Sequence, residues 1–256
     1  MNPFTVHVPA LANAREMRAL ATELKFLVTP AAAREIRAWA RAELAADPHG
    51  AGPYADEYTI SSLYFDTDAL DVLHRRGSYG RAKYRVRRYG TTALAFLERK
   101  MRTKSLLAKR RTVIALDDLE VLHDDELVEG WAGAWFHERI RVRRLLPLVQ
   151  VAYSRIAREM TGPYGVVRLT VDEELKALPA LDCEFGNAAG RPVLHDRAIV
   201  EIKYRRALPA KFRTLIDTHR LVPARISKYR LAQDALRPNA VPSPIRLEAG
   251  AALVFA

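Results

Sequence analysis

Three Glu-x-Lys triplets are the residues of this sequence best suited to chemistry on phosphate groups. They are Glu23-Leu24-Lys25, Glu98-Arg99-Lys100 and Glu201-Ile202-Lys203. In a β-strand, residues i and i+2 share a face, so each triplet would present a carboxylate and an ammonium group side by side. Ammonium groups neutralise phosphoryl oxygens, and carboxylates hold hard divalent cations that bridge phosphates. A ladder of cross-strand salt bridges would use the same residue types, so a single triplet does not separate the two interpretations.

The positive charge of the chain is concentrated around the second triplet. The 256 residues carry a formal net charge of +11. Between Arg81 and Arg111 there are twelve Lys or Arg and one acid, Glu98, so this segment alone accounts for the whole excess. A basic excess of this size indicates an anionic partner, and its confinement to one segment indicates a local binding device.

The triplets lie in segments that read as strands with one charged and one apolar face. In 81–87, Arg81, Lys83, Arg85 and Arg87 alternate with Ala82, Tyr84 and Val86, the period of a strand. For one strand, charges facing water are the simpler explanation. Five such strands favour an α+β fold in which a closed antiparallel β-tunnel of about eight strands has a charged lumen and helices packed outside. The expected strands are 22–28, 58–66, 81–89, 94–101, 108–116, 148–157, 166–172 and 198–205.

Amphipathic spacing predicts five helices outside these strands. They are expected at about 30–46, 68–76, 130–143, 207–219 and 228–236. We predict one domain over 22–236, an N-terminal extension over 1–21 and an irregular C-terminal tail over 237–256. Ser227 is a candidate N-cap for the last helix, and Lys228 in its first turn would suit an anion docked at that helix terminus.

Several functional classes are excluded by missing motifs. The sequence contains no Walker loop and no G-x-G-x-x-G turn, so a Walker ATPase or a Rossmann enzyme is not expected. A single cysteine, Cys183, permits neither an internal disulfide nor a cysteine-built zinc site and fits a cytoplasmic location. No stretch is long and apolar enough to span a bilayer. The parities of Tyr84 and Tyr89 place them on opposite faces, which argues against a stacking platform for nucleic acid.

The ordered fragments of this chain resemble the VTC domain, a branch of the triphosphate tunnel metalloenzyme superfamily that includes the CYTH enzymes. The resemblance runs from about 22 to 236. It is carried by ELKFLV (23–28), SLYFDT (62–67), KYRVRRYG (83–90), FLERK (96–100), AKRR (108–111), YSR (153–155), VRLTVD (167–172), VEIKY (200–204) and SKY (227–229).

The resemblance implies a polyphosphate polymerase that transfers the γ-phosphoryl group of ATP to a growing inorganic polyphosphate chain and releases ADP, with Mn²⁺ or Mg²⁺ as cofactor. It leaves room for a separate membrane partner. The phosphate-binding cations would be Lys25, Arg85, Arg87, Lys100, Lys109, Arg155, Arg168 and Lys228. Substrate contacts would come from Tyr153, Ser227, Lys83 and Lys203. The metal ligands would be Glu201, with Glu23, Glu98 and Asp172 as weaker candidates.

Two alternatives stay open. One is a metal-dependent tripolyphosphatase or nucleoside triphosphatase of the same superfamily, which would use the same cations with water as acceptor. The ELK at 23–25, in place of the E-x-E-x-K run of the CYTH enzymes, favours the polymerase. The other is a non-catalytic polyphosphate-binding module, against which the carboxylate of Glu201 argues, since it would only repel a polyanion without a metal.

Overall fold

The computed structural model describes residues 14–19, 22–102, 106–187, 189–237 and 245–247. Its contacts divide the chain into two compact units. The first unit comprises Met1–Ala19, Ile60–Ala152 and Ala177–Arg191, and the second comprises Leu20–Thr59, Tyr153–Lys176 and Pro192–Ala256. Three long strands, β4, β8 and β9, pass from one unit into the other.

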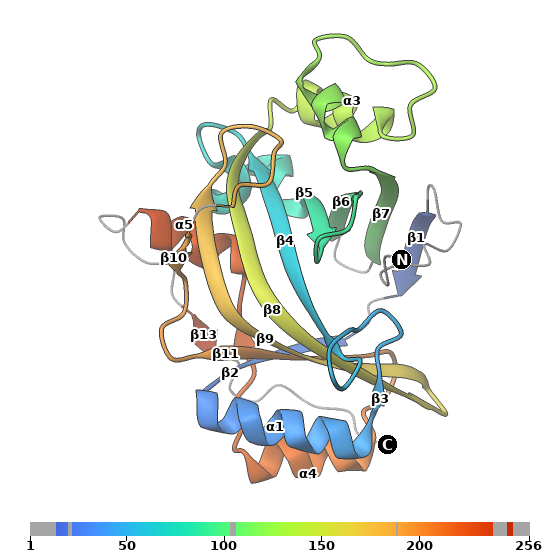
Figure 1. Ribbon diagram of the computed structural model, residues 1–256, viewed down its shortest axis with the longest axis vertical. Coiled ribbons are helices and arrows are strands. Elements are labelled where there is room, and N and C mark those ends of the chain that lie inside the picture. The colour runs from blue at the N-terminus through green and yellow to red at the C-terminus, as the bar shows by residue number, and fades with distance from the viewer. Residues whose placement is uncertain (1–13, 20–21, 103–105, 188, 238–244, 248–256) are drawn as a thin grey trace. The chain divides into compact units, whose positions relative to one another are not determined.

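The fold is α+β, with a large sheet in the order β1-β7-β6-β5-β4-β8-β9-β11-β2, to which β3 and β10 add short pairs (Figure 1). The pairs β1–β7, β7–β6, β6–β5, β5–β4, β9–β11 and β11–β2 are antiparallel. The strands are β1 (Ala14–Ala19), β2 (Thr22–Val28), β3 (Ala45–Ala46), β4 (Glu57–Asp66), β5 (Ala82–Tyr89), β6 (Leu94–Arg102), β7 (Leu106–Ala115), β8 (Leu146–Gly162), β9 (Gly165–Pro179), β10 (Arg191–Pro192), β11 (Ala198–Tyr204), and the separate pair β12 (Ala224–Arg225) and β13 (Arg246–Leu247).

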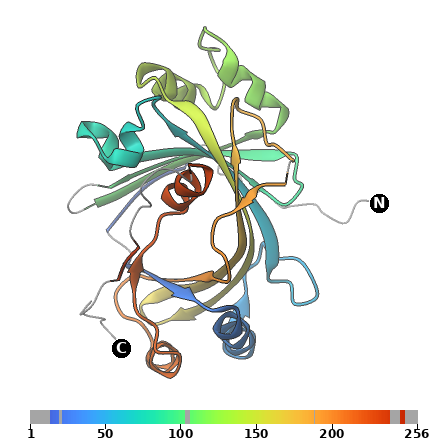
Figure 2. The ribbon, with the colours of Figure 1, turned by 90° about the vertical axis from the view of Figure 1, so that its left-hand side faces the viewer.

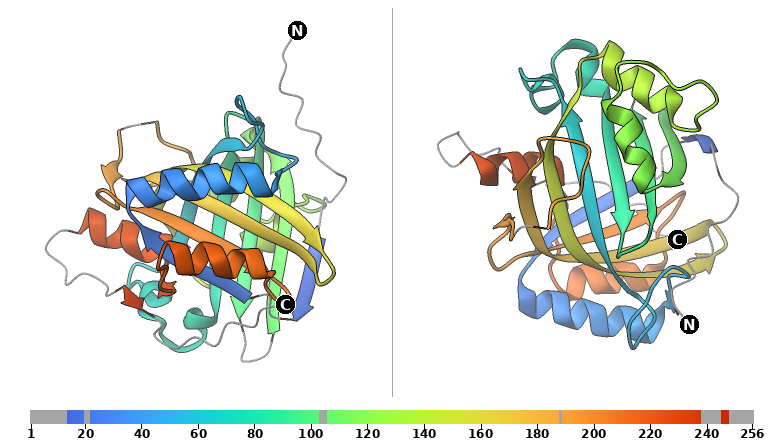
Figure 3. Two further views of the ribbon diagram at one scale, coloured as in Figure 1. Left: turned by 90° about the horizontal axis from the view of Figure 1, so that it is seen from below. Right: turned by 45° about the horizontal axis from the view of Figure 1, so that its top comes forward.

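In the first unit, one face of the strands is covered by helix α3 (Ala134–Val142), as the right panel of Figure 3 shows. The fully buried ring of Phe136 packs edge-on against Phe65, Tyr84 and Trp135, with ring centroids 5.5, 5.9 and 5.5 Å away. Helix α2 (Asp71–His74) is held by the buried carboxylate of Asp66, which accepts backbone N–H bonds from Val72 and Leu73. Two short 3₁₀ helices, Gly77–Arg81 and Asp117–His123, complete this unit.

In the second unit, helices α1 (Pro30–Glu43) and α4 (Ala210–Thr218) lie side by side on the apolar face of the strands (Figure 1; Figure 3, left). Thr29 caps α1 by accepting a bond from the Ala32 N–H at 3.2 Å, and Pro30 occupies the first helical position, a common way to begin a helix. The two helices meet where Trp39 packs edge-on against Phe212. Beneath them lie buried residues of β2, β9 and β11, among them Phe26.

Helix α5 (Lys228–Leu236) lies on the other face of these strands (Figures 1 and 2). On β11, the side chain of Glu201 points to the face covered by α5, where it bonds to Lys228. The neighbouring Val200 and Ile202 belong to the core under α1 and α4. The alternation predicted for this strand is therefore confirmed, and α5 is placed on its charged face.

All eight expected strands and all five expected helices are present, with changed ends. Strands β8 and β9 are longer than predicted. In β9, the Glu173-Glu174 pair interrupts the alternation of charged and apolar residues. Glu174 adopts a φ of +53°, and the strand continues beyond it. Helix α2 is shorter because Leu70 and Arg75 at its ends adopt left-handed backbone conformations.

The sheet has eleven strands where about eight were predicted, and it is not closed. Its order begins at β1 and ends at β2 over the described residues, so strand pairing does not confirm the predicted closed tunnel. Strand β1 lies within the predicted extension 1–21, of which 1–13 and 20–21 are outside the described residues. Strand β13 lies within the predicted tail 237–256, of which 238–244 and 248–256 are outside them. No described helix combines the length and apolarity needed to cross a bilayer.

Replacing Phe136 by Ala is expected to lower the free energy of unfolding by about 3–5 kcal/mol, because the ring is fully buried and its removal leaves a cavity between α3 and the strands. Urea unfolding followed by circular dichroism measures this. Val142→Ala, at an exposed position of the same helix, is the control and should change stability little. An equal loss for both variants would contradict the placement of α3.

Candidate functional site

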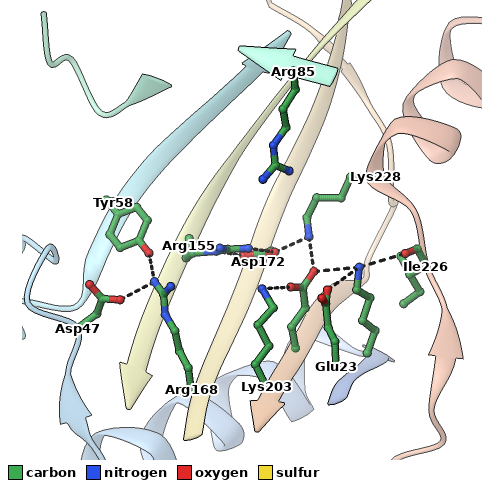
Figure 4. A network of polar contacts seen from close by, with 12 residues as sticks. Glu23, Asp47, Tyr58, Arg85, Arg155, Arg168, Asp172, Lys203, Ile226 and Lys228 are labelled. Atoms are coloured by element: carbon green, nitrogen blue, oxygen red, sulfur yellow. Dashed lines mark hydrogen bonds and ion pairs between the residues drawn. The ribbon is translucent and has the colours of Figure 1, made fainter. Parts of the chain in front are cut away.

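In the second unit, the polar residues gather around Glu201 on β11. The register places Lys25 of β2 opposite Glu201 on one side and Thr170 of β9 on the other. Lys228 reaches from α5 and donates to Glu201 Oε1 at 2.9 Å (Figure 4). Lys25 Nζ lies 3.5 Å from Glu201 Oε1 and Lys203 Nζ lies 3.4 Å from Glu201 Oε2. One buried carboxylate thus collects three ammonium groups.

A second carboxylate, Asp172 on β9, joins this cluster through Lys228. Arg155 of β8 binds Asp172 with two bonds, Nε to Oδ1 at 2.6 Å and Nη2 to Oδ2 at 2.7 Å. Lys228 Nζ lies 2.6 Å from Asp172 Oδ2 (Figure 4). The ring of Tyr153 lies below both cations, 5.4 Å from Arg155 Cζ and 5.1 Å from Lys228 Nζ. Arg155, Asp172, Lys228 and Glu201 are all buried.

Both carboxylates stay ionised despite this burial. Burial raises the pKa of Glu201, but Lys228, Lys25 and Lys203 outweigh it and hold that pKa well below the ordinary 4.5. Burial likewise opposes ionisation of Asp172, and Arg155 and Lys228 lower its pKa. In return, Asp172 and Glu201 raise the pKa of Lys228 against the effect of burial. Glu201, Asp172 and Lys228 are therefore all charged at neutral pH.

The edge of this cluster is formed by the start of β2 and the start of α5. Lys25 Nζ lies 3.1 Å from Glu23 Oε1 and donates to the Ile226 carbonyl oxygen at 3.3 Å. Ser227 is the N-cap of α5, as predicted, and its Oγ accepts from the Arg230 N–H at 3.5 Å.

In the first unit, the polar residues gather around Glu98 on β6, which is 2% exposed. The register places Arg85 of β5 and Arg111 of β7 directly opposite Glu98 on its two sides. Arg85 Nε donates to Oε2 at 2.6 Å and Arg111 Nε donates to Oε1 at 2.7 Å. Lys109 Nζ lies 3.6 Å from Oε1. Burial raises the pKa of Glu98, but Arg85, Arg87, Arg111 and Lys109 together hold it well below 4.5.

Hydroxyl groups complete this second cluster. Arg87 Nε donates to Ser62 Oγ at 3.1 Å, Arg85 Nη1 to Tyr64 Oη at 3.4 Å, and Arg111 Nη2 to Tyr89 Oη at 3.1 Å. Burial raises the pKa of Tyr89, but Arg87 and Arg111 bring it down to about 7. The pKa of Lys109 is lowered to about 8, chiefly by burial and against the attraction of Glu98.

Three further predicted cations are Lys83, Lys100 and Arg168. Lys83, Lys100 and Lys109 face one another in register across β5, β6 and β7, and Lys83 and Lys100 are exposed. Arg168 contacts Asp47 and donates to Tyr58 Oη at 2.7 Å (Figure 4). Arg168 therefore contacts the start of β4 and the loop before that strand.

The four predicted metal ligands are divided between the units, with Glu98 in the first and Glu23, Asp172 and Glu201 in the second. Each makes at least one ion pair, and Asp172 is occupied by Arg155 on both oxygens. Over the described part of the chain, no three His, Cys, Asp or Glu side chains form a metal-binding group. The donor set fits a metal that phosphate oxygens help to hold, because Mg²⁺ is commonly bound by one or two carboxylates plus substrate phosphates.

Five residues of these clusters were missed by the sequence analysis: Ser62, Tyr64, Tyr89, Arg111 and Thr170. Tyr89 shares the parity of Arg85 and Arg87, and Arg111 shares that of Lys109, so the period of two could have found both. Thr170 lies between Arg168 and Asp172 on the same face, and its buried Oγ1 has no hydrogen-bond partner in the described structure. Tyr64 could not be found this way, because its contact depends on the pairing of β4 with β5.

Replacing Glu98 by Gln is expected to lower the free energy of unfolding at pH 7 by about 2 kcal/mol. The change leaves Arg85 and Arg111 close together without their counter-charge, and their partial exposure makes the loss smaller than for a fully buried pair. Because the folded state lowers the pKa of Glu98, its stabilisation is present above pH 4.5 and is lost as the pH falls below that value. The variant should therefore lose less stability than the wild type between pH 4.5 and pH 3.

Urea unfolding across this pH range measures both effects. Glu138→Gln removes an exposed glutamate of α3 and should reproduce the wild-type curve. Parallel curves for Glu98→Gln and the wild type would show that Glu98 is not held ionised by the surrounding cations.

The comparisons with known proteins agree with this fold. The model of the VTC domain family matches residues 20–237, whereas no curated protein matches. Among solved structures, the chain is similar to a Bacillus halodurans protein provisionally assigned as an adenylate cyclase, with 13% identity and a TM-score of 0.51 over 83% of this chain and 95% of that one. It is also similar to HpAC1 from Hippeastrum, a provisional adenylyl cyclase with a dominant triphosphatase activity, with 13% identity and a TM-score of 0.48 over 84% and 96%.

At 13% identity, the Bacillus halodurans structure shows a shared fold alone. The family model, in contrast, covers most of the chain and spans every residue of both clusters. This protein belongs to the VTC domain family.

Proposed function

We propose that this protein is a polyphosphate polymerase that transfers the γ-phosphoryl group of ATP to an inorganic polyphosphate chain and releases ADP. The observation that carries the proposal is the surplus of cations in both clusters. Arg85, Lys109 and Arg111 share one carboxylate, Glu98. A cation surplus on a buried face is costly by itself, and phosphate oxygens are the ligands that would offset it.

The cluster around Glu201 also contains more cations than carboxylates. Lys25, Lys203, Lys228 and Arg155 meet Glu201 and Asp172, with Glu23 at the edge beside Lys25. Because the carboxylates fix the direction of each cation, phosphate groups would enter a preorganised site, which is the main source of electrostatic stabilisation in enzymes. Membership of the VTC domain family makes ATP and polyphosphate the expected substrates.

The proposed reaction needs no protein base. A terminal oxygen of the polyphosphate chain is already an anion and attacks the γ-phosphorus of ATP. A new P–O–P bond forms, the bond from the γ-phosphorus to the bridging oxygen breaks, and the electron pair leaves with ADP. Within each unit the cations would neutralise charge on phosphoryl oxygens, Arg85 and Arg87 in the first unit and Arg155 and Lys228 in the second.

A divalent metal, Mn²⁺ or Mg²⁺, belongs to this proposal. Glu201 and Glu23 are the carboxylates we expect to hold it together with phosphate oxygens, since both lie beside Lys25 and Glu23 is partly exposed. When bound, the metal would supply further charge neutralisation. Asp172 and Glu98 are better placed to hold Arg155, Arg85 and Arg111 in position.

The closed tunnel is also part of the proposal and rests on the family resemblance. We assign the catalytic domain to 22–236, as predicted from the sequence.

Incubation of the purified protein with ATP and Mn²⁺, followed by phosphorus NMR, tests the proposal. We expect an internal-phosphate resonance that grows as ADP accumulates. Orthophosphate as the only product would show that the protein is a triphosphatase and not a polymerase. No turnover, with polyphosphate binding intact, would make the protein a binding module.

The double variant Arg85→Ala and Arg87→Ala should lose at least 100-fold in rate, about 2.7 kcal/mol of transition-state stabilisation. Arg139→Ala with Arg141→Ala removes the same charge from exposed positions of α3 and should retain activity. A wild-type rate in the variant carrying Arg85→Ala and Arg87→Ala would show that these two arginines do not belong to the site.

A further inference from the structure

Arg168 of β9 and Lys203 of β11 face each other directly in the register of the second unit. Like charges directly opposite each other destabilise an antiparallel pair. Lys203 is compensated by Glu201, whose Oε2 lies 3.4 Å from the Lys203 Nζ. Arg168 instead contacts Asp47, which follows β3 directly, and Tyr58 on β4 (Figure 4). The two cations can therefore stay side by side, because each has its own partner.

The carboxylate of Asp47 is fixed independently of Arg168. Its side chain is 4% exposed, and its Oδ1 accepts from the His49 N–H at 2.9 Å. The backbone N–H of Asp47 donates to the Ala157 carbonyl oxygen of β8 at 3.1 Å. Arg168 contacts the other carboxylate oxygen, Oδ2. The turn after β3 and the strand β8 therefore set the position at which Asp47 receives Arg168.

These contacts engage one nitrogen of Arg168. Its Nη2 makes the ion pair with Asp47 Oδ2 and donates to Tyr58 Oη at 2.7 Å. A guanidinium group has five N–H donors, of which three belong to Nε and Nη1. Neither of these nitrogens has a hydrogen-bond partner within the described ranges of the chain, and the side chain is 33% exposed. Arg168 is therefore anchored at Nη2 and retains donors for a ligand.

We propose that Asp47 and Tyr58 are positioning residues, which hold Arg168 through Nη2 so that its Nη1 meets a phosphate group next to Lys203. The choice of phosphate as ligand rests on the proposed function. Arginine binds phosphate through directional, charge-assisted bonds, so its orientation matters as well as its charge. A side chain that is held in this orientation beforehand loses less conformational entropy when the ligand binds. Asp47 and Tyr58 thus strengthen phosphate binding without contacting the phosphate.

The substitution Asp47→Asn separates positioning from simple neutralisation, because the two roles predict opposite changes in affinity. Asparagine keeps an oxygen for the His49 N–H but removes the negative charge that holds Arg168. If Asp47 orients Arg168, affinity for tripolyphosphate should fall about tenfold, the loss of one charge-assisted contact. If Asp47 only neutralises Arg168, the additional positive charge should raise affinity for this anion.

Tyr58→Phe tests the same role without a change of charge, and Arg168→Ala completes a double-mutant cycle. Tyr58→Phe should weaken tripolyphosphate binding about fivefold in the wild type and have no further effect in Arg168→Ala, because Tyr58 acts through Arg168. Binding is measured by calorimetry in the presence of Mn²⁺. The matched controls are Tyr164→Phe, at an exposed tyrosine, and Asp217→Asn, at an exposed aspartate of α4. Both controls should change affinity little.

If the contacts of Arg168 serve folding alone, Tyr58→Phe should lower the thermal midpoint and leave affinity unchanged, which would overturn the positioning role. An equal loss of affinity with and without Arg168, or tighter binding by Asp47→Asn, would also overturn it. Tripolyphosphate binding does not depend on turnover, so this test remains decisive if phosphorus NMR shows no polymerase activity. A wild-type protein that binds no tripolyphosphate would overturn the choice of phosphate as ligand and, with it, the positioning role.

Discussion

The ion pairing of buried carboxylates with a surplus of cations is the constraint on which this structure depends. Glu98 and Glu201 each lie on a strand that is paired on both sides, and each binds cations supplied by neighbouring elements. Without these carboxylates the cations would repel one another on a buried face, and without the cations the carboxylates would not remain ionised there. Each cluster therefore keeps its positive charges close together and correctly directed before any ligand arrives.

The rest of the fold serves to bury one face of each strand while leaving the other for charge. Helices α1 and α4 cover the apolar face of the second unit, and α3 covers that of the first. Packing of α3 against the apolar face explains how cations can be held at fixed positions on the other face of β5, β6 and β7. Helix α5 is the exception, since it approaches the charged face and contributes Lys228 to it.

The period of two in the sequence was enough to predict which residues share a face, and the structure confirms this for Arg85, Arg87 and Glu98. Contacts between distant elements could not be predicted in this way. The contacts of Arg168 with Asp47 and Tyr58 were not predicted, because the positions of those two residues depend on how the chain enters β4. The end of β9 was missed because Glu174 departs from regular strand geometry while the strand continues.

The most direct test of this account is calorimetric titration of tripolyphosphate in a metal-free buffer at several salt concentrations. If preorganised cations are the main binding groups, tripolyphosphate should bind without metal, and its affinity should fall steeply as salt rises. Added Mn²⁺ should then strengthen binding further. Absence of binding until Mn²⁺ is added would contradict the account. It would mean that the buried carboxylates serve mainly as metal ligands, and that orienting the cations is their lesser role.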